Sequence, residues 1–162
     1  TVIPTAEMVR KVEVAVESRT SADFLIIART DARSSLGIDE AIARGQAYAA
    51  AGADVVFVES PESEDEFAQV VAEVDAPVLA NVVEGGFSPV LSADRLAELG
   101  VTIGLFPVTA LLAVTAQLQA VYGRLRADGI GPTPGADMRS ISDLHGLMGL
   151  DEVQQFEERW ND

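Results

Sequence analysis

The sequence predicts an α/β fold in which four parallel strands are connected by helices and followed by a helical tail. Four short apolar runs recur along the chain, and β-branched side chains are common in them: residues 24–28, 55–58, 77–83 and 103–106. Continuous apolar runs of this kind are typical of parallel strands that are covered on both faces. A helical pattern fits between each run and the next, which is the rhythm of βα units.

Helices are expected before, between and after these runs. Helical patterns lie at residues 5–19, 39–53, 93–100 and 109–127, and a further helix is expected to begin at Ser63. Ser63 and Glu66 fit a capping box, and Ser92 fits the N-cap of a short helix. Gly52 and Gly100 stand where helices are expected to end.

Two segments follow from this pattern. Residues 1–130 are expected to form the βα body, and residues 131–162 a Pro/Gly-rich linker with one or two short helices. The tail carries Met148, Phe156 and Trp160, which we expect to pack on a neighbouring subunit.

Four parallel strands leave two open sheet edges. A complete (β/α)8 barrel has eight strands and typically about 250 residues. The pattern therefore fits either a small open sheet or half of a barrel, and it does not choose between them.

Polar residues follow the apolar runs, at the carboxyl ends of the expected strands: Arg29, Thr30, Asp31, Glu59, Ser60, Asn81, Glu84, Gly85, Gly86, Ser88, Pro107 and Thr109. Ligands of α/β folds bind at these ends. An arginine offers a two-pronged contact to a carboxylate, and the backbone N–H groups of a glycine pair can hold an anion. We therefore expect a site for a small polyanion such as a carboxylate.

Structural explanations compete with this hypothesis. Arg29 and Asp31 could simply pair, Glu59 could be a rim residue, and Gly85 with Gly86 could form only a tight turn. Asn81 is harder to explain structurally, because a buried amide needs several hydrogen-bond partners. His145 is the only histidine, and its place in the tail favours a structural role.

The composition excludes several classes of function. The chain has 26 acidic and 11 basic residues, a net charge of −15, which argues against nucleic acid or an anionic membrane as partner. It has no cysteine, so it forms no disulfide and offers no thiol chemistry. No apolar run approaches the roughly 20 residues of a membrane span, and we expect a cytoplasmic protein.

Several motifs together resemble the isocitrate lyase/phosphoenolpyruvate mutase superfamily, over about residues 5–130. They are ARTDA at 28–32, EAIARGQAYAAAGAD at 40–54 leading into VFVE at 56–59, NVVEGGFSP at 81–89 and LFP at 105–107. The resemblance implies Mg²⁺-dependent enzymes that make or break C–C or P–C bonds next to a carboxylate or keto acid. It also implies that this chain is the C-terminal half of a (β/α)8 barrel.

The resemblance implies catalytic roles at the first two strand ends. Arg29 would bind a substrate carboxylate and the developing enolate charge. Glu59 would orient the substrate and a metal-bound water. Asp31 would support them.

The later motifs imply roles in substrate binding. Asn81, Glu84 and Gly85 would hold the other carboxylate or a hydroxyl of the substrate. Ser88 would shape the specificity wall, and Pro107 would support it.

The chain also departs from the superfamily pattern. The metal-binding carboxylates and the loop with the catalytic cysteine precede the helix with which this chain begins, so no metal ligand is expected here. The resemblance then implies three partners: a small carboxylate substrate, the N-terminal half of the barrel holding most of the Mg²⁺ ligands, and further subunits of a dimer or tetramer.

The leading hypothesis is a Mg²⁺-dependent carbon–carbon lyase that cleaves a small 2-hydroxy or 2-keto di- or tricarboxylate through an enolate. The alternatives are phosphonomutase-type P–C chemistry, a non-catalytic half-barrel scaffold, and an open-sheet domain that binds small acids.

Overall fold

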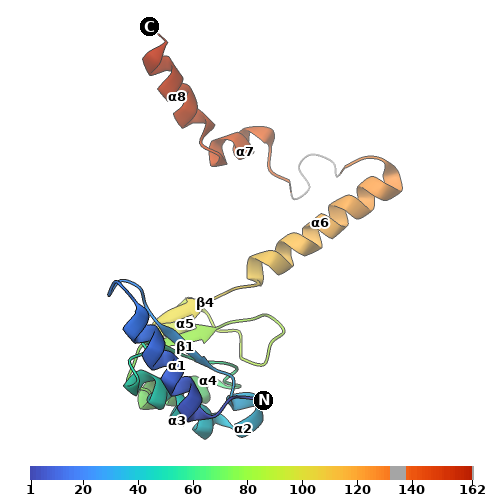
Figure 1. Ribbon diagram of the computed structural model, residues 1–162. Helices are drawn as coiled ribbons and strands as arrows, with labels where there is room; N and C mark the ends of the chain where they lie inside the picture. The colour runs from blue at the N-terminus through green and yellow to red at the C-terminus, as the bar shows by residue number, and fades with distance from the viewer. Residues whose placement is uncertain (132–137, 162) are drawn as a thin grey trace. The chain divides into compact units, whose positions relative to one another are not determined.

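The computed structural model describes residues 1–131 and 138–161 (Figure 1). The chain divides into two compact units, Thr1–Leu112 and Ala113–Asp162. The first unit contains one parallel sheet in the order β1-β2-β3-β4. Its strands are β1 (Ile27–Thr30), β2 (Val55–Val58), β3 (Val78–Asn81) and β4 (Ile103–Leu105).

Five helices accompany the sheet: α1 (Thr5–Ser18), α2 (Arg33–Leu36), α3 (Ile38–Ala50), α4 (Glu64–Glu73) and α5 (Ala93–Glu98). Ser63 is the N-cap of α4, and its hydroxyl accepts from the Glu66 N–H at 3.2 Å. The other half of the expected capping box is absent, because the Glu66 carboxylate accepts from Arg33 and from the Glu62 N–H instead. Ser92 caps α5, as predicted.

One face of the sheet packs against helices. Val56, Val58 and Val78 point to this face and form one buried cluster with Ile42 of α3 and Val70 of α4. The fit between α3 and the sheet is close, since a Cβ on the helical Gly45 would lie 3.1 Å from a methyl group of Val56. Smaller clusters extend the same layer.

The opposite face of the sheet carries no helix of the first unit, Thr1–Leu112. Its cluster contains only strand side chains, Val55, Phe57 and Leu79, with Ile103 beside them. At the edges of this face Ile27 and Leu105 are 48% and 42% exposed. The expectation that both faces are covered is therefore wrong within Thr1–Leu112, because the helices of this unit that pack on the sheet lie on one side.

The first strand is displaced from its expected position. Residues 24–28 were the expected run, but the strand is Ile27–Thr30, and Phe24 is 66% exposed. The Asp54 carboxylate accepts from the Ile26 N–H at 2.8 Å and from Arg19 at 2.7 Å. This anchors the chain at Ile26, so strand pairing starts one residue later, opposite Val55.

The correction moves two candidate residues into the strand. Arg29 and Thr30 are part of β1, and Asp31 is the first residue after it. The expected runs 77–83 and 103–106 contain β3 and β4 but are longer than either, and 55–58 matches β2.

Helix α6 (Thr109–Asp128) spans the boundary between the units, and α7 (Ile141–Leu147) and α8 (Leu150–Trp160) follow it. The long helix is confirmed, and α7 and α8 agree with the expected one or two short helices of the tail. In α8 the side chains of Val153, Phe156 and Trp160 recur at helical spacing and are 52–71% exposed. The division at residue 130 and the packing on a neighbouring subunit stay predictions, and residues 132–137 of the expected linker lie outside the described residues.

None of the described helices combines the length and apolar character needed to cross a membrane.

Candidate active site

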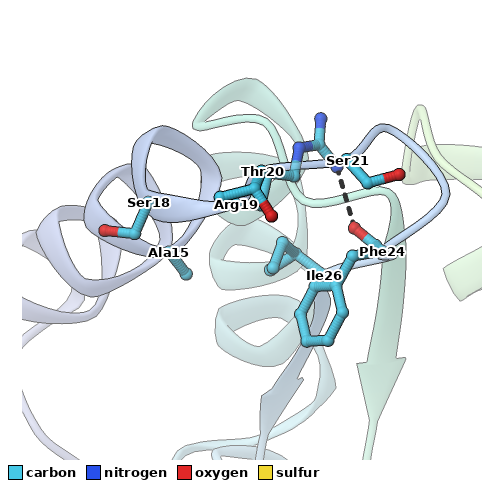
Figure 2. Close-up of a pocket in the computed structure, with 7 residues that line it drawn as sticks. All are labelled: Ala15, Ser18, Arg19, Thr20, Ser21, Phe24 and Ile26. Carbon is cyan, nitrogen blue, oxygen red and sulfur yellow. Dashed lines mark hydrogen bonds between the residues drawn. The ribbon is translucent and has the colours of Figure 1, made fainter.

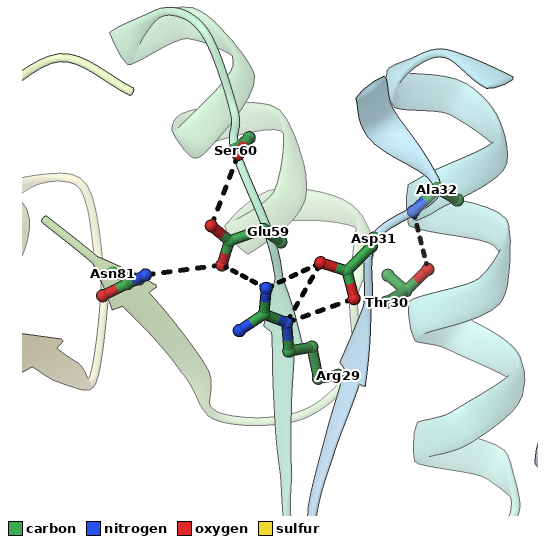
Figure 3. Close-up of polar contacts among 7 residues, drawn as sticks. All are labelled: Arg29, Thr30, Asp31, Ala32, Glu59, Ser60 and Asn81. Carbon is green, nitrogen blue, oxygen red and sulfur yellow. Dashed lines mark hydrogen bonds and ion pairs between the residues drawn. The ribbon is translucent and has the colours of Figure 1, made fainter. Parts of the chain in front are cut away.

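Side chains from three neighbouring strands meet at the carboxyl end of the sheet (Figure 3). Arg29 lies in β1, Glu59 directly follows β2, and Asn81 is the last residue of β3. The parallel register fixes this meeting, because Thr30 pairs with Val58 and its carbonyl accepts from the Glu59 N–H at 2.9 Å.

The Arg29 guanidinium is held on several sides. Its Nε lies 3.2 Å from both Asp31 oxygens, and its Nη2 lies 2.6 Å from Asp31 Oδ1 and 3.3 Å from Glu59 Oε2. Its Cζ lies 4.8 Å from the centre of the Phe57 ring, a cation–π contact. The hydrogen bond to Asp31 raises the pKa of Arg29 above its ordinary value. Burial lowers the pKa, and the negative charges of Glu59 and Asp31 raise it further. Arg29 is therefore a fixed cation at the rim of the sheet.

Glu59 connects Arg29 to the next strand. Asn81 Nδ2 donates to Glu59 Oε2 at 3.4 Å, and the Ser60 hydroxyl donates to Oε1 at 3.4 Å. Ser60 has a left-handed backbone with a φ of 60°, which is uncommon for a residue other than glycine. Because Nδ2 faces Glu59, the amide oxygen of Asn81 points away from it, and Oδ1 is buried without a partner in the described residues.

Glu84 makes a separate contact. Its Oε1 accepts from the hydroxyl of Thr109, the first residue of α6, at 2.5 Å. This hydrogen bond lowers the pKa of Glu84, as does the backbone N–H of Glu84, while burial opposes them. Glu84 Oε2 is buried and has no partner in the described residues. The sequence predicts no role for Thr109, because a hydroxyl just after a strand is its only signal.

The remaining candidates lie around this corner. Gly85 adopts a φ of 78°, the left-handed region that glycine enters without steric cost, so the chain turns directly after Glu84. Ser88 is half-buried and Pro107 is exposed. Among the described residues no side-chain hydrogen bond joins Ser88 to Arg29, Glu59 or Asn81, so the roles of Ser88 and Pro107 stay predictions.

Two hollows border β1 at opposite ends. One of about 440 Å³ lies beside residues 15–26, where Arg19 donates to the Phe24 carbonyl at 3.3 Å (Figure 2). The other hollow has a volume of about 290 Å³, and Arg29, Thr30 and Asp31 are among the residues that line it. The second is the better candidate for a polar ligand, because the first is mainly apolar and lies at the amino end of the strand.

No group of three or more His, Cys, Asp or Glu side chains could hold a metal ion together within residues 1–131 and 138–161. Asp31 and Glu59 both hold Arg29. The described residues therefore do not form a metal site by themselves.

Comparison with known proteins gives consistent matches. Residues 1–125 match the family model described as phosphoenolpyruvate phosphomutase. The chain is 38% identical to 2,3-dimethylmalate lyase of Eubacterium barkeri over 159 residues, which cover 98% of this chain and 55% of that protein.

Two solved structures have the same fold. Oxaloacetate acetylhydrolase in complex with the product oxalate superposes with a TM-score of 0.83 at 32% identity, covering 100% of this chain and 56% of that one. Phosphonopyruvate hydrolase in complex with oxalate and Mg²⁺ superposes with a TM-score of 0.78 at 29% identity, covering 99% and 58%. The chain thus spans about half the length of the proteins it matches.

These matches confirm the predicted fold class, the C-terminal half of a (β/α)8 barrel followed by helices. They also confirm the resemblance on which the expected site residues depend. The chain belongs to the phosphoenolpyruvate phosphomutase family, within the isocitrate lyase/phosphoenolpyruvate mutase superfamily.

Proposed function

We propose that this chain supplies the C-terminal half of the active site of a Mg²⁺-dependent carbon–carbon lyase. The substrate is a small 2-hydroxy or 2-keto di- or tricarboxylate, and the reaction passes through an enolate. The observation that carries the proposal is the Arg29 guanidinium, held by Asp31 and Glu59 at the carboxyl end of the sheet. Relatives named for dimethylmalate and oxaloacetate support the choice of substrate class.

The fixed guanidinium suits this chemistry. Breaking a C–C bond next to a carboxylate or carbonyl leaves an electron pair that is delocalised as an enolate. A cation that is already oriented stabilises this charge without reorganising. Within the described residues Arg29 Nη1 makes no hydrogen bond, so it is available to a ligand oxygen. Glu59 contacts Arg29, Asn81 contacts Glu59, and both would orient the ligand.

Mg²⁺ remains part of the proposal, with most of its ligands in the N-terminal half that the superfamily pattern implies. The proton donor for the enolate would come from the same half. What this chain contributes is Arg29 and the polar groups around it.

The assembly is also a proposal. The exposed side chains of Val153, Phe156 and Trp160 on α8 would be buried against a neighbouring subunit of a dimer or tetramer. We expect this oligomer in the cytoplasm.

Arg29→Ala in the full-length protein tests the function. With Mg²⁺ present, a panel of acids beginning with 2,3-dimethylmalate and oxaloacetate is screened for release of pyruvate or oxalate. For the acid that is turned over, kcat/KM should fall at least about tenfold, roughly 1.4 kcal/mol.

Arg95→Ala is the matched control for this test. Arg95 is also half-exposed and pairs with Glu64 and Glu98, but it lies in α5. Its loss should leave kcat/KM unchanged. A fall of less than tenfold for Arg29→Ala, or an equal fall for both variants, would show that Arg29 does not have the proposed role.

Phosphorus–carbon chemistry is the second candidate, favoured by the family description and by the match to phosphonopyruvate hydrolase. Incubation with phosphonopyruvate, followed by ³¹P NMR, separates the two. Release of phosphate or formation of phosphoenolpyruvate, without cleavage of any acid in the panel, would select this candidate over the lyase.

A further inference from the structure

The pair formed by Glu84 and Thr109 is not explained by the contacts of Arg29. Glu84 follows β3, and Thr109 begins α6 after β4. The 2.5 Å hydrogen bond between them joins the loop after β3 to the start of α6. It uses only one of the two carboxylate oxygens.

The second oxygen, Glu84 Oε2, is buried and has no partner among the described residues. The amide oxygen of Asn81, at the end of β3, is also buried and has no partner among the described residues. Buried polar atoms in folded proteins are nearly always paired. Both atoms are acceptors, since an ionised carboxylate and an amide oxygen can only accept. This corner therefore needs hydrogen-bond donors that the described residues do not supply.

We propose that Thr109 is a positioning residue that holds Glu84 so that Oε2 accepts a hydrogen bond from a hydroxyl group of the ligand. The inference rests on the proposed function, a small acid bound beside Arg29. A second carboxylate of the ligand would be repelled by the negative charge of Glu84, whereas an O–H group would donate a hydrogen bond to Glu84 Oε2. Of the two groups expected at this corner, the hydroxyl is thus favoured over the carboxylate.

The ionisation of Glu84 is consistent with this role. The Thr109 hydroxyl and the backbone N–H of Glu84 lower its pKa, burial opposes them, and no charged side chain of the described residues contributes. Without the hydroxyl the pKa of Glu84 rises toward its ordinary value. The carboxylate then becomes protonated at a higher pH, and hydroxyl binding is lost sooner as the pH falls.

The test compares two probes in the full-length protein, malate and succinate, which differ only by the hydroxyl. Dissociation constants are measured by calorimetry for the wild type, Thr109→Val and Thr109→Ser. The wild type should bind malate at least about tenfold more tightly than succinate, as expected for a hydrogen bond to a charged group. Thr109→Val should remove most of this preference by weakening malate alone, and Thr109→Ser should restore it.

A pH series separates positioning from a general structural effect. In Thr109→Val, malate affinity should be lost at a higher pH on acidification than in the wild type. The pH dependence of succinate affinity should be the same in both proteins. Thr115→Val, which removes an exposed hydroxyl elsewhere in α6, should leave the affinities for both acids and their pH dependence unchanged. If Thr109→Val does not fold, Glu84→Gln provides the same comparison of malate with succinate.

Two results would overturn the inference while leaving the proposed function intact. One is equal affinity of the wild type for malate and succinate, which would mean that water satisfies Glu84. The other is an equal weakening of both acids by Thr109→Val. If the wild type bound neither acid and cleaved none of the panel, the proposed function would fail, and this inference with it.

Discussion

The two faces of the sheet differ although they are built by the same strands. In β2, Val56 and Val58 point toward the helices and are 0% and 2% exposed, whereas Phe57 points to the other face. Glu59 continues the alternation of Phe57 and reaches Arg29. Because side chains alternate along a strand, those that pack against the helices lie on one face and those near Arg29 lie on the other. Changes on the helix-covered face should affect the stability of the protein, and changes on the open face should affect the ligand.

The largest effect is expected on the helix-covered face. Phe67 of α4 is 2% exposed and packs with Ala80, Val82 and Leu96. Phe67→Ala should lower the free energy of unfolding by about 3–5 kcal/mol, through lost burial and the cavity left behind. Urea denaturation of the full-length protein measures it. Phe87→Ala, at a phenylalanine that is 78% exposed, should cost less than about 0.5 kcal/mol. Similar losses of unfolding free energy for Phe67→Ala and Phe87→Ala would contradict the special contribution of the helix-covered face to stability.

A smaller effect on stability is expected on the open face. Phe57→Leu keeps an apolar side chain beside Val55 and Leu79 but removes the ring beneath Arg29. The free energy of unfolding should fall by about 1 kcal/mol. The loss of the cation–π contact should also lower kcat/KM about threefold, measured beside the denaturation curve. A loss of stability equal to that of Phe67→Ala, with normal kcat/KM, would contradict the division between the faces.

The smallest effect concerns an ion pair that joins two helices of the covered face. Arg33 of α2 donates to Glu66 of α4 at 2.7 Å and 3.0 Å, and this hydrogen bonding lowers the pKa of Glu66 below its ordinary 4.5. The stabilisation is therefore present above pH 4.5 and is lost as the pH falls below it. Glu66→Gln should cost at most about 1 kcal/mol at pH 7. Thermal unfolding between pH 3 and 7 checks the prediction, because the variant should lose less stability on acidification than the wild type. An unchanged pH dependence would exclude this role for Glu66.

Local patterns predicted most of the fold. The strand at 55–58 and the helix from 109 are continuous patterns, and Ser63 and Ser92 are caps whose hydroxyls need only a neighbouring N–H. The start of β1 was missed because Phe24 is apolar, while the residue that fixes the strand, Asp54, is distant in sequence. The open face was missed because a strand's composition does not indicate which elements cover it.

The candidate site was predictable where it depends on strand ends. Arg29, Glu59 and Asn81 meet because parallel strands end at one edge, and this follows from their order in the chain. The contact of Thr109 with Glu84 depends on how the loop after β3 folds toward the start of α6. No periodicity encodes such a contact, so the sequence predicted Glu84 and gave Thr109 no role.

The pairing of Arg29 with Asp31 has a consequence for how the guanidinium would meet a ligand. Asp31 uses Nε and Nη2, whereas Nη1 makes no hydrogen bond among the described residues. An acid that binds Nη1 in the proposed site would leave the pair with Asp31 intact, so the guanidinium would keep its orientation. An acid that used Nε and Nη2 would instead have to displace Asp31, and its net gain would be only the difference between two similar ion pairs. The pairing thus favours a ligand oxygen on Nη1.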